Sequence, residues 1–167
     1  LECIREVDPI YLDKKILVVG SGTMGQRVVT KLVALGHSQV FITNRTNSKA
    51  KIVAEENKVS YVDYSTFRKH ILDYDIVIFA TSCQGHILGV QHLQKDYSRS
   101  LILVDLGVPR NVEPILNTFD YVNLIGLDGF KEVVSKTLKD RSGEADKVKL
   151  LIQEESSRFH SWLLNRR

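Results

Sequence analysis

Apolar residues are arranged along this chain in short, nearly continuous runs that alternate with helix-length segments. The runs are rich in Val and Ile, which is typical of strands covered on both faces by helices. Five of them occupy residues 14–19, 39–43, 75–81, 100–106 and 121–125, and a shorter one over 59–62 is expected as an additional strand near the sheet edge.

Capping residues bound the segments between these runs. The first segment begins near Thr23 and is closed by Gly36, because glycine tolerates the left-handed conformation that follows a helix. The second is expected to open at Ser48 and the third at Ser65, because a serine hydroxyl accepts a hydrogen bond from the first turn. The alternation predicts an α/β fold with a doubly wound parallel sheet and right-handed crossovers.

The C-terminal segment, residues 128–167, has a helical pattern only. Apolar residues recur there at intervals of three to four from Val133 to Leu163, which indicates a long amphipathic helix, interrupted near Ser142. Two interpretations of its apolar stripe stay open: it packs back onto the sheet, or it packs on a helix of a partner subunit or another domain. We therefore expect an N-terminal linker over 1–13, a sheet domain over 14–127 and a C-terminal long-helix extension over 128–167.

Composition excludes several classes of function. A net charge of +3 gives no argument for nucleic acid, and no apolar run approaches the roughly 20 residues of a membrane span. The two cysteines, Cys3 and Cys83, form neither a disulfide framework nor a metal-binding spacing. We therefore expect a cytoplasmic protein with no metal site and no membrane contact. The chain begins at Leu1 rather than Met, which suggests a larger parent protein.

A glycine motif of the form G-x-G-x-x-G follows the first predicted strand and opens the first predicted helix, as dinucleotide binding requires. Gly20 permits the tight turn, Gly22 permits close approach of a pyrophosphate, and Gly25 permits close packing of helix on strand. The backbone amides of Thr23 and Met24 would then point at phosphate oxygens. The predicted Rossmann phosphate loop comprises Gly20, Ser21, Gly22, Thr23, Met24 and Gly25.

The end of the second strand indicates which dinucleotide binds. NAD enzymes place an acid there to hold the ribose 2′-hydroxyl, but this chain has Asn44, Arg45 and Thr46. Arg45 would pair with a 2′-phosphate and stack on adenine, while Thr46, Ser48 and Lys49 add donors or charge. The sequence therefore favours NADP(H) over NAD(H).

Residues after the fourth and fifth strands complete the candidate site. Thr81 and Ser82 either contact the nicotinamide ribose or only cap the strand, and Gly107 would let the nicotinamide approach the backbone. Arg110 either binds an anionic substrate group or pairs with a nearby acid such as Asp105 or Glu113. Cys83 and His86 lie three residues apart on a loop, which is no evidence of a catalytic pair.

These motifs resemble those of the glutamyl-tRNA reductase family. The resemblance runs from about residue 12 to the end. It is carried by "KKILVVGSGTMGQRVVTKL", "ITNRT", "LILVDLGVPRNVEP" and the tail "LLIQEESSRFHSWL". The "NRT" motif is shared with shikimate dehydrogenases, whereas "DLGVPRNVEP" followed by a long helix is more specific.

The resemblance implies an NADPH-binding domain that donates hydride in the reduction of glutamyl-tRNA to glutamate-1-semialdehyde for tetrapyrrole synthesis. In that family, a cysteine of a separate N-terminal domain attacks the aminoacyl ester, and long C-terminal helices form a homodimer. Cys3 lacks the family's S-T-C-N-R setting, so no catalytic residue is assigned and we expect the chain to be inactive alone. Glutamyl-tRNA would be a partner only of the complete enzyme.

The chain departs from the family pattern at two places. Asn111 stands where the family usually has an acid, and Asp128-Gly129-Phe130 stands where it usually has D-D-L. Two alternatives therefore stay open. One is a standalone NADP-binding or dimerisation protein. The other is a dehydrogenase similar to that of the siroheme pathway, for which Asp105 is the obvious catalytic candidate.

Overall fold

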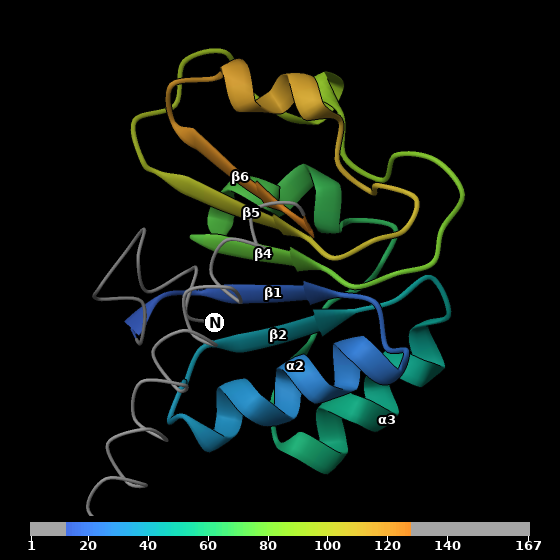
Figure 1. Ribbon diagram of the computed structural model, residues 1–167. Helices are drawn as coiled ribbons and strands as arrows, with labels where there is room; N and C mark the ends of the chain where they lie inside the picture. Colours follow the sequence, from blue (N-terminus) through green and yellow to red (C-terminus); the bar gives the residue numbers. More distant parts are fainter. Residues whose placement is uncertain (1–12, 128–167) are drawn as a thin grey trace, which may run out of the picture. The chain divides into compact units, whose positions relative to one another are not determined.

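A parallel sheet of six strands forms the centre of the part of the chain that the computed structural model describes, residues 13–127 (Figure 1). The strands are β1 (Ile16–Val19), β2 (Val40–Thr43), β3 (Ser60–Tyr61), β4 (Ile76–Phe79), β5 (Leu101–Asp105) and β6 (Val122–Gly126). Their order is β3-β2-β1-β4-β5-β6, the order of a doubly wound dinucleotide-binding sheet. The predicted fold class and all six predicted strands are confirmed. The predicted helical segment over 128–167 and nearly all of the predicted linker lie outside the described residues.

Strands β1 and β4 lie side by side in the middle of the sheet, with Ile16 opposite Ile76. All residues of both strands are buried, because helices and loops cover both faces. The chain runs outward from β1 through β2 to β3, then returns to β4 and runs outward on the other side. This reversal creates a crevice at the carboxyl ends of β1 and β4, where folds of this class bind ligands.

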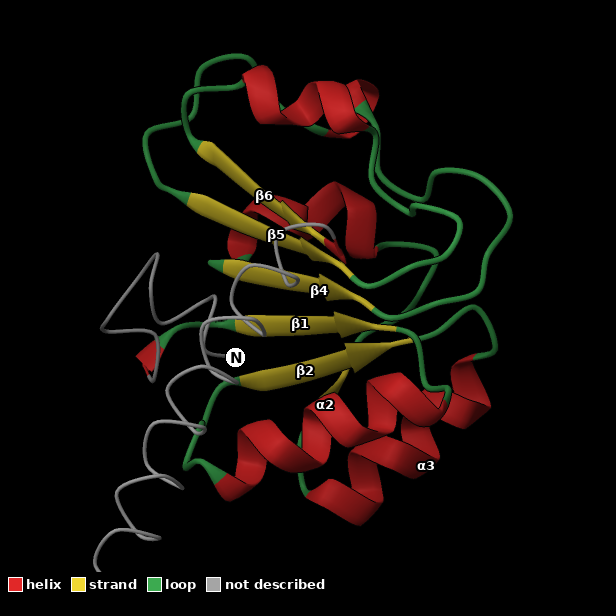
Figure 2. Cartoon of the chain, in the orientation of Figure 1, coloured by secondary structure: helices red, strands yellow, loops and turns green. Residues whose placement is uncertain are grey.

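Two α-helices belong to the first half of the sheet. Helix α2 (Thr23–Ala34) packs against β1 and β2, and α3 (Asn47–Asn57) packs against α2, β2 and β3 (Figure 2). Gly36 closes α2 as predicted: its φ is +89° and its N–H donates to the Val33 carbonyl at 3.0 Å. The second half of the sheet is connected instead by loops and the 3-10 helices η2 (Phe67–Asp73), η3 (Val90–His92) and η4 (Pro114–Thr118).

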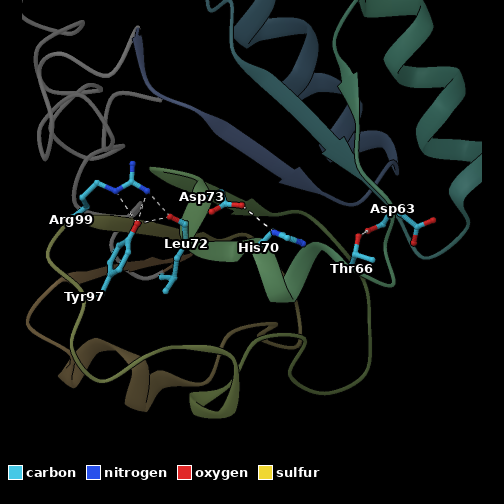
Figure 3. Close-up of polar contacts among 7 residues, drawn as sticks. All are labelled: Asp63, Thr66, His70, Leu72, Asp73, Tyr97 and Arg99. Atoms are coloured by element: carbon cyan, nitrogen blue, oxygen red, sulfur yellow. Dashed lines mark hydrogen bonds and ion pairs between the residues drawn. The ribbon is translucent and has the colours of Figure 1, made fainter.

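The predictions that Ser48 and Ser65 act as N-caps are wrong. Helix α3 begins at Asn47, so Ser48 already lies inside its first turn. The third segment begins at Phe67 and is a 3-10 helix with Thr66 as its N-cap. Asp63 organises the turn before it. Its carboxylate accepts hydrogen bonds from the hydroxyl of Ser65 at 2.5 Å and from its backbone N–H at 2.8 Å, and these bonds lower the pKa of Asp63. The Asp63 carbonyl also accepts a bond from the Thr66 hydroxyl (Figure 3).

Side-chain bonds also secure the connection from β4 to β5. The Tyr97 hydroxyl donates to the carbonyl of Leu72, and the Arg99 guanidinium donates to both of these oxygens (Figure 3). A shallow hollow lies here, lined by Lys95, Asp96, Tyr97, Ser98, Ser100, Asp120 and Tyr121. Its residues precede β5 and β6, so it belongs to the amino-terminal edge of the sheet, away from the crevice. Within residues 13–127 we find no helix with the length and hydropathy of a membrane span.

Candidate functional site

A pocket of about 460 Å³ opens at the carboxyl ends of β1, β2 and β4. It is lined by Gly20, Gly22, Asn44, Arg45, Tyr64, Ala80, Thr81, Ser82, Cys83, Gln84 and Ile87. The sequence prediction included six of these residues, Gly20, Gly22, Asn44, Arg45, Thr81 and Ser82. The structure therefore brings the start of the glycine loop, the end of β2 and the end of β4 together at one place.

The three glycines of the loop have different environments. Gly20 has a φ of +115°, and a Cβ there would lie 2.4 Å from the Ala80 carbonyl oxygen. A Cβ on Gly25 would lie 2.0 Å from the Gly20 carbonyl oxygen, so α2 approaches the loop too closely for any side chain. A Cβ on Gly22 would meet nothing within 4 Å. Gly20 and Gly25 are therefore required by packing, whereas Gly22 faces open space beside the pocket.

The first turn of α2 follows Gly22 with no side chain capping it. Gly22 is the N-cap, and its carbonyl accepts the first helical bond, from the N–H of Gln26 at 2.9 Å. The preceding N–H groups, those of Thr23 and Met24 among them, have no acceptor within a helix. The first turn contains no acidic residue, and both Thr23 and Met24 are exposed. This arrangement presents backbone donors and the positive end of the helix to an anion.

Asn44 connects the glycine loop to the end of β2. Its Oδ1 accepts a bond from the N–H of Ser21 at 3.3 Å, and its Nδ2 donates to the Thr46 carbonyl at 3.1 Å. Ser21 is buried, and its carbonyl accepts a further bond from the Gln26 side chain at 3.0 Å. Ser21 and Asn44 therefore fix the shape of the loop.

Positive charge accompanies this loop on the β2 side. Arg45 lines the pocket and is exposed, and Lys49 is exposed in the first turn of α3. Thr46 is the N-cap of that helix, whose first turn also lacks an acidic residue. No carboxylate belongs to the lining that residues 13–127 provide. The positive charge suits a phosphate group. The acidic side chain that holds the 2′-hydroxyl of an unphosphorylated ribose in NAD enzymes has no counterpart in this lining.

Thr81 makes two hydrogen bonds within the protein, which favours the capping interpretation, while its contact with a nicotinamide ribose stays a prediction. Its hydroxyl donates to Asn111 Oδ1 at 2.8 Å and accepts a bond from the N–H of Cys83 at 3.1 Å. The neighbouring Ser82 lines the same pocket and is exposed. Of the two hydroxyls, that of Ser82 is the better placed to contact a ligand.

The loop after β5 is built around a buried carboxylate. Asp105 accepts hydrogen bonds from the N–H groups of Gly107 at 2.9 Å, Asn111 at 2.8 Å and Val112 at 3.0 Å. A Cβ on Gly107 would lie 2.6 Å from the Asn111 side chain, so Gly107 is required by this packing. Gly107 is buried and does not line the pocket, and its approach to a nicotinamide stays a prediction. Arg110 lies exposed on the same loop.

Cys83 and His86 do not form a hydrogen-bonded pair in the structure. The Cys83 thiol donates to the Gln84 carbonyl oxygen at 3.7 Å. His86 is exposed and does not belong to the pocket lining. Among residues 13–127 no group of three or more His, Cys, Asp or Glu side chains is placed to hold a metal ion.

Four further residues line the pocket but were missed by the sequence analysis: Tyr64, Ala80, Gln84 and Ile87. Tyr64 follows the short edge strand β3, and Ile87 lies in the long loop after β4. Neither belongs to a motif with a fixed spacing from the glycines. The position of Tyr64 directly after a strand was the one signal that it lies at the carboxyl edge.

Comparison with known proteins agrees with this geometry. A family model described as shikimate / quinate 5-dehydrogenase matches residues 5–133. Glutamyl-tRNA reductase of Chlorobaculum parvum is 34% identical over 155 residues, which cover 90% of this chain and 36% of that protein. The enzyme of Solibacter usitatus is 33% identical over 163 residues, or 95% of this chain and 39% of its own length. The chain belongs to the shikimate/quinate dehydrogenase family, as a nucleotide-binding domain of the glutamyl-tRNA reductase type.

Solved structures agree with the assignment to this domain type. Glutamyl-tRNA reductase from Methanopyrus kandleri superposes with a TM-score of 0.84 at 29% identity, over 97% of this chain and 42% of that chain. The nucleotide-binding domain of the Thermoplasma volcanium enzyme has the same fold, with a TM-score of 0.66 at 23% identity over 84% of this chain and 94% of that chain. The chain spans between a third and two-fifths of the length of the curated relatives described above.

Proposed function

We propose that this domain binds NADPH and serves as the hydride-donating part of a glutamyl-tRNA reductase. When bound, NADPH supplies a hydride for reducing the activated glutamyl ester to glutamate-1-semialdehyde. The observation that carries the proposal is the pocket itself, where the open backbone at Gly22 and the cation of Arg45 share a lining without a carboxylate among the described residues. The solved structure of quinate dehydrogenase from Corynebacterium glutamicum, of related fold, is a complex with NAD, which supports a nicotinamide cofactor.

Each element of the pocket has a place in this proposal. The N–H groups at the start of α2 would hold the pyrophosphate, and Arg45 would hold the 2′-phosphate, with Lys49 and the start of α3 as further positive charge. Ser82 contributes a hydroxyl from the end of β4. Ser21, Asn44, Thr46 and Thr81 hold the loops in place.

The proposal is tested by comparing the affinities of NADPH and NADH by calorimetry. We expect NADPH to bind more tightly, and we expect Arg45→Ala to remove most of the difference, because a guanidinium pairs strongly with phosphate. Lys31→Ala is the matched control, since it removes one positive charge from the other end of α2 and should leave the ratio unchanged. Equal affinities in the unmodified chain would contradict the NADPH assignment.

The complete enzyme requires parts that this domain does not contain. We propose that a separate N-terminal domain supplies the nucleophilic cysteine and contacts glutamyl-tRNA in the cytoplasm, and that residues 128–167 form a homodimer. Light scattering of the whole chain and of a chain ending at residue 139 tests the second point. A dimer that becomes a monomer on truncation is expected, and a monomer in both cases would contradict it.

No second function is proposed for Asp105. A dehydrogenase of the siroheme type would use this carboxylate near the nicotinamide. Both oxygens of Asp105 instead accept backbone hydrogen bonds, and the residue is 3% exposed. This geometry favours a structural role.

A further inference from the structure

Tyr64 forms part of the pocket wall, although it belongs to none of the dinucleotide-binding motifs in the sequence. It lies just beyond β3 and is half-buried. Its N–H donates to Asn47 Oδ1 at 3.3 Å, which ties it to the start of α3. The ring therefore lies at the carboxyl edge of the sheet, on the side of β2 and β3, which is also the side of Arg45.

Arg68 and Phe67 hold the Tyr64 ring in place. The Arg68 guanidinium donates to the Tyr64 hydroxyl at 3.0 Å and to the Ile87 carbonyl at 2.8 Å, so one side chain joins two residues of the pocket wall. Arg68 Cζ also lies 4.9 Å from the centroid of the Tyr64 ring. The centroid of the Phe67 ring lies 5.1 Å from it. A ring held in this way loses little further freedom when a ligand packs on it.

The covalent structure of NADPH determines which part of the cofactor lies near this ring. The 2′-phosphate that we assign to Arg45 is carried by the ribose to which adenine is attached. The adenine ring must therefore lie within one sugar of Arg45. On this side of the pocket the aromatic surface in the lining is that of Tyr64, with the apolar side chain of Ile87 in the same wall.

We propose that Tyr64 is the stacking platform for the adenine ring of the bound dinucleotide, and that Arg68 is a positioning residue that holds it. This inference rests on the proposed NADPH site, and it names the side chain in that site that binds the adenine base. Stacking of a base on an aromatic side chain is sequence-tolerant and contributes strongly to affinity. In this assignment the α2 terminus would hold the pyrophosphate and Arg45 the 2′-phosphate. Tyr64 would provide the aromatic surface for the adenine ring, in addition to the contact with Arg45 that the sequence predicts.

Half-molecules of the cofactor test this assignment. Calorimetry on the full chain compares NADPH, adenosine 2′,5′-bisphosphate and reduced nicotinamide mononucleotide. For Tyr64→Leu we expect about a tenfold loss of affinity for the first two and none for the third, because only the first two contain adenine. Tyr64→Phe keeps the ring and should bind within about threefold of the unmodified chain. It loses only the hydroxyl contact with Arg68.

A spectroscopic measurement on the unmodified chain does not depend on how the variants fold. Stacking on Tyr64 places the adenine H2 and H8 protons in the ring current of the tyrosine, so their resonances should move upfield on binding and show contacts to the Tyr64 ring protons. Arg68→Met should weaken these contacts while the 2′-phosphate preference set by Arg45 persists.

The possible failures are distinguishable. If the unmodified chain binds neither NADPH nor the bisphosphate, the proposed function fails. If it binds both and Tyr64→Leu binds them equally well, or if Tyr64→Phe is as weak as Tyr64→Leu, the stacking assignment is overturned while the NADPH site stands. Bound adenine protons without a contact to Tyr64 would overturn it as well.

Discussion

The loops after β1 and after β5 both lie at the carboxyl edge of the sheet, and both contain a glycine close to the strand end, but they treat their backbone donors in opposite ways. After β5, Asp105 accepts three backbone N–H groups, and the Asn111 side chain occupies the space beside Gly107. After β1, no side chain caps the start of α2, and the space beside Gly22 is open.

The difference shows that a glycine at a strand end is not by itself a ligand-binding feature. A loop that satisfies its own N–H groups is part of the framework, because buried donors must be paired for the fold to be stable. A loop that leaves donors exposed at a helix start is suited to an anion. Gly107 and Gly22 both follow a strand, but the N–H groups of the loop at Gly107 are paired within the protein, whereas those that follow Gly22 are exposed.

The largest effect is expected at the framework loop. Asp105→Ala removes the acceptor of three N–H groups in a buried place, so we expect the free energy of unfolding to fall by about 4 kcal/mol. Chemical denaturation measures this loss. Asp73→Ala serves as the control, because the Asp73 side chain is 66% exposed and its loss should cost less than about 0.5 kcal/mol. Equal losses in the two variants would refute the framework role of Asp105.

Gly25→Ala should destabilise the other loop by steric conflict. The new methyl group would lie 2.0 Å from the Gly20 carbonyl oxygen, which is backbone and moves only with the loop. We expect a loss of about 3 kcal/mol in the free energy of unfolding. Thermal and chemical denaturation check it, and unchanged stability in the Gly25→Ala variant would show that the helix start is not packed against the loop.

Gly22→Ala should separate binding from stability. Its φ is −73°, which alanine adopts without strain, and the new methyl group would meet no protein atom within 4 Å. The unfolding midpoint should therefore stay unchanged while the affinity for NADPH falls about tenfold or more, because the methyl group occupies the place of the pyrophosphate. A variant that binds NADPH normally would place the pyrophosphate elsewhere.

These contrasts explain how far the sequence could predict the molecule. The six strands and the closure of α2 at Gly36 follow from local patterns, because apolar runs and a C-terminal glycine act within a few residues of themselves. Ser48 and Ser65 were assigned wrongly as caps. Helix α3 begins one residue before Ser48, with Thr46 as its N-cap, and the Ser65 hydroxyl donates to Asp63. Asn47 donates to Asp63 across 16 residues, which no local pattern reveals.

The candidate site divides in the same way, into residues that belong to local motifs and residues brought in by tertiary contacts. Gly20, Gly22 and Arg45 stand at the spacings of a dinucleotide-binding motif, and the structure brings all three into the lining of one pocket. Their binding of a cofactor stays a prediction. Tyr64 lies in the turn after an edge strand and Ile87 in a long loop, and the side chain of Arg68 bonds to both. The sequence could place Tyr64 near the carboxyl edge, but the contacts that form this wall are tertiary and follow from no local pattern.

The smallest effect is expected at the junction of the two regions. Thr81→Val removes the hydroxyl that joins Asn111 to the N–H of Cys83, so we expect a loss of about 1 kcal/mol in the free energy of unfolding. NADPH affinity should change less than about threefold, because the hydroxyl is already engaged with the protein. A large loss of affinity without a loss of stability would instead give Thr81 a direct role in binding.

The most direct test of the central claim is an NMR titration of the backbone amides with NADPH. We predict that the amide resonances of Gly22, Thr23 and Met24 show the largest shifts, and that those of Asn111 and Val112, which already donate to Asp105, move much less. Unmoved resonances at Gly22, Thr23 and Met24 in a chain that binds NADPH would contradict the account.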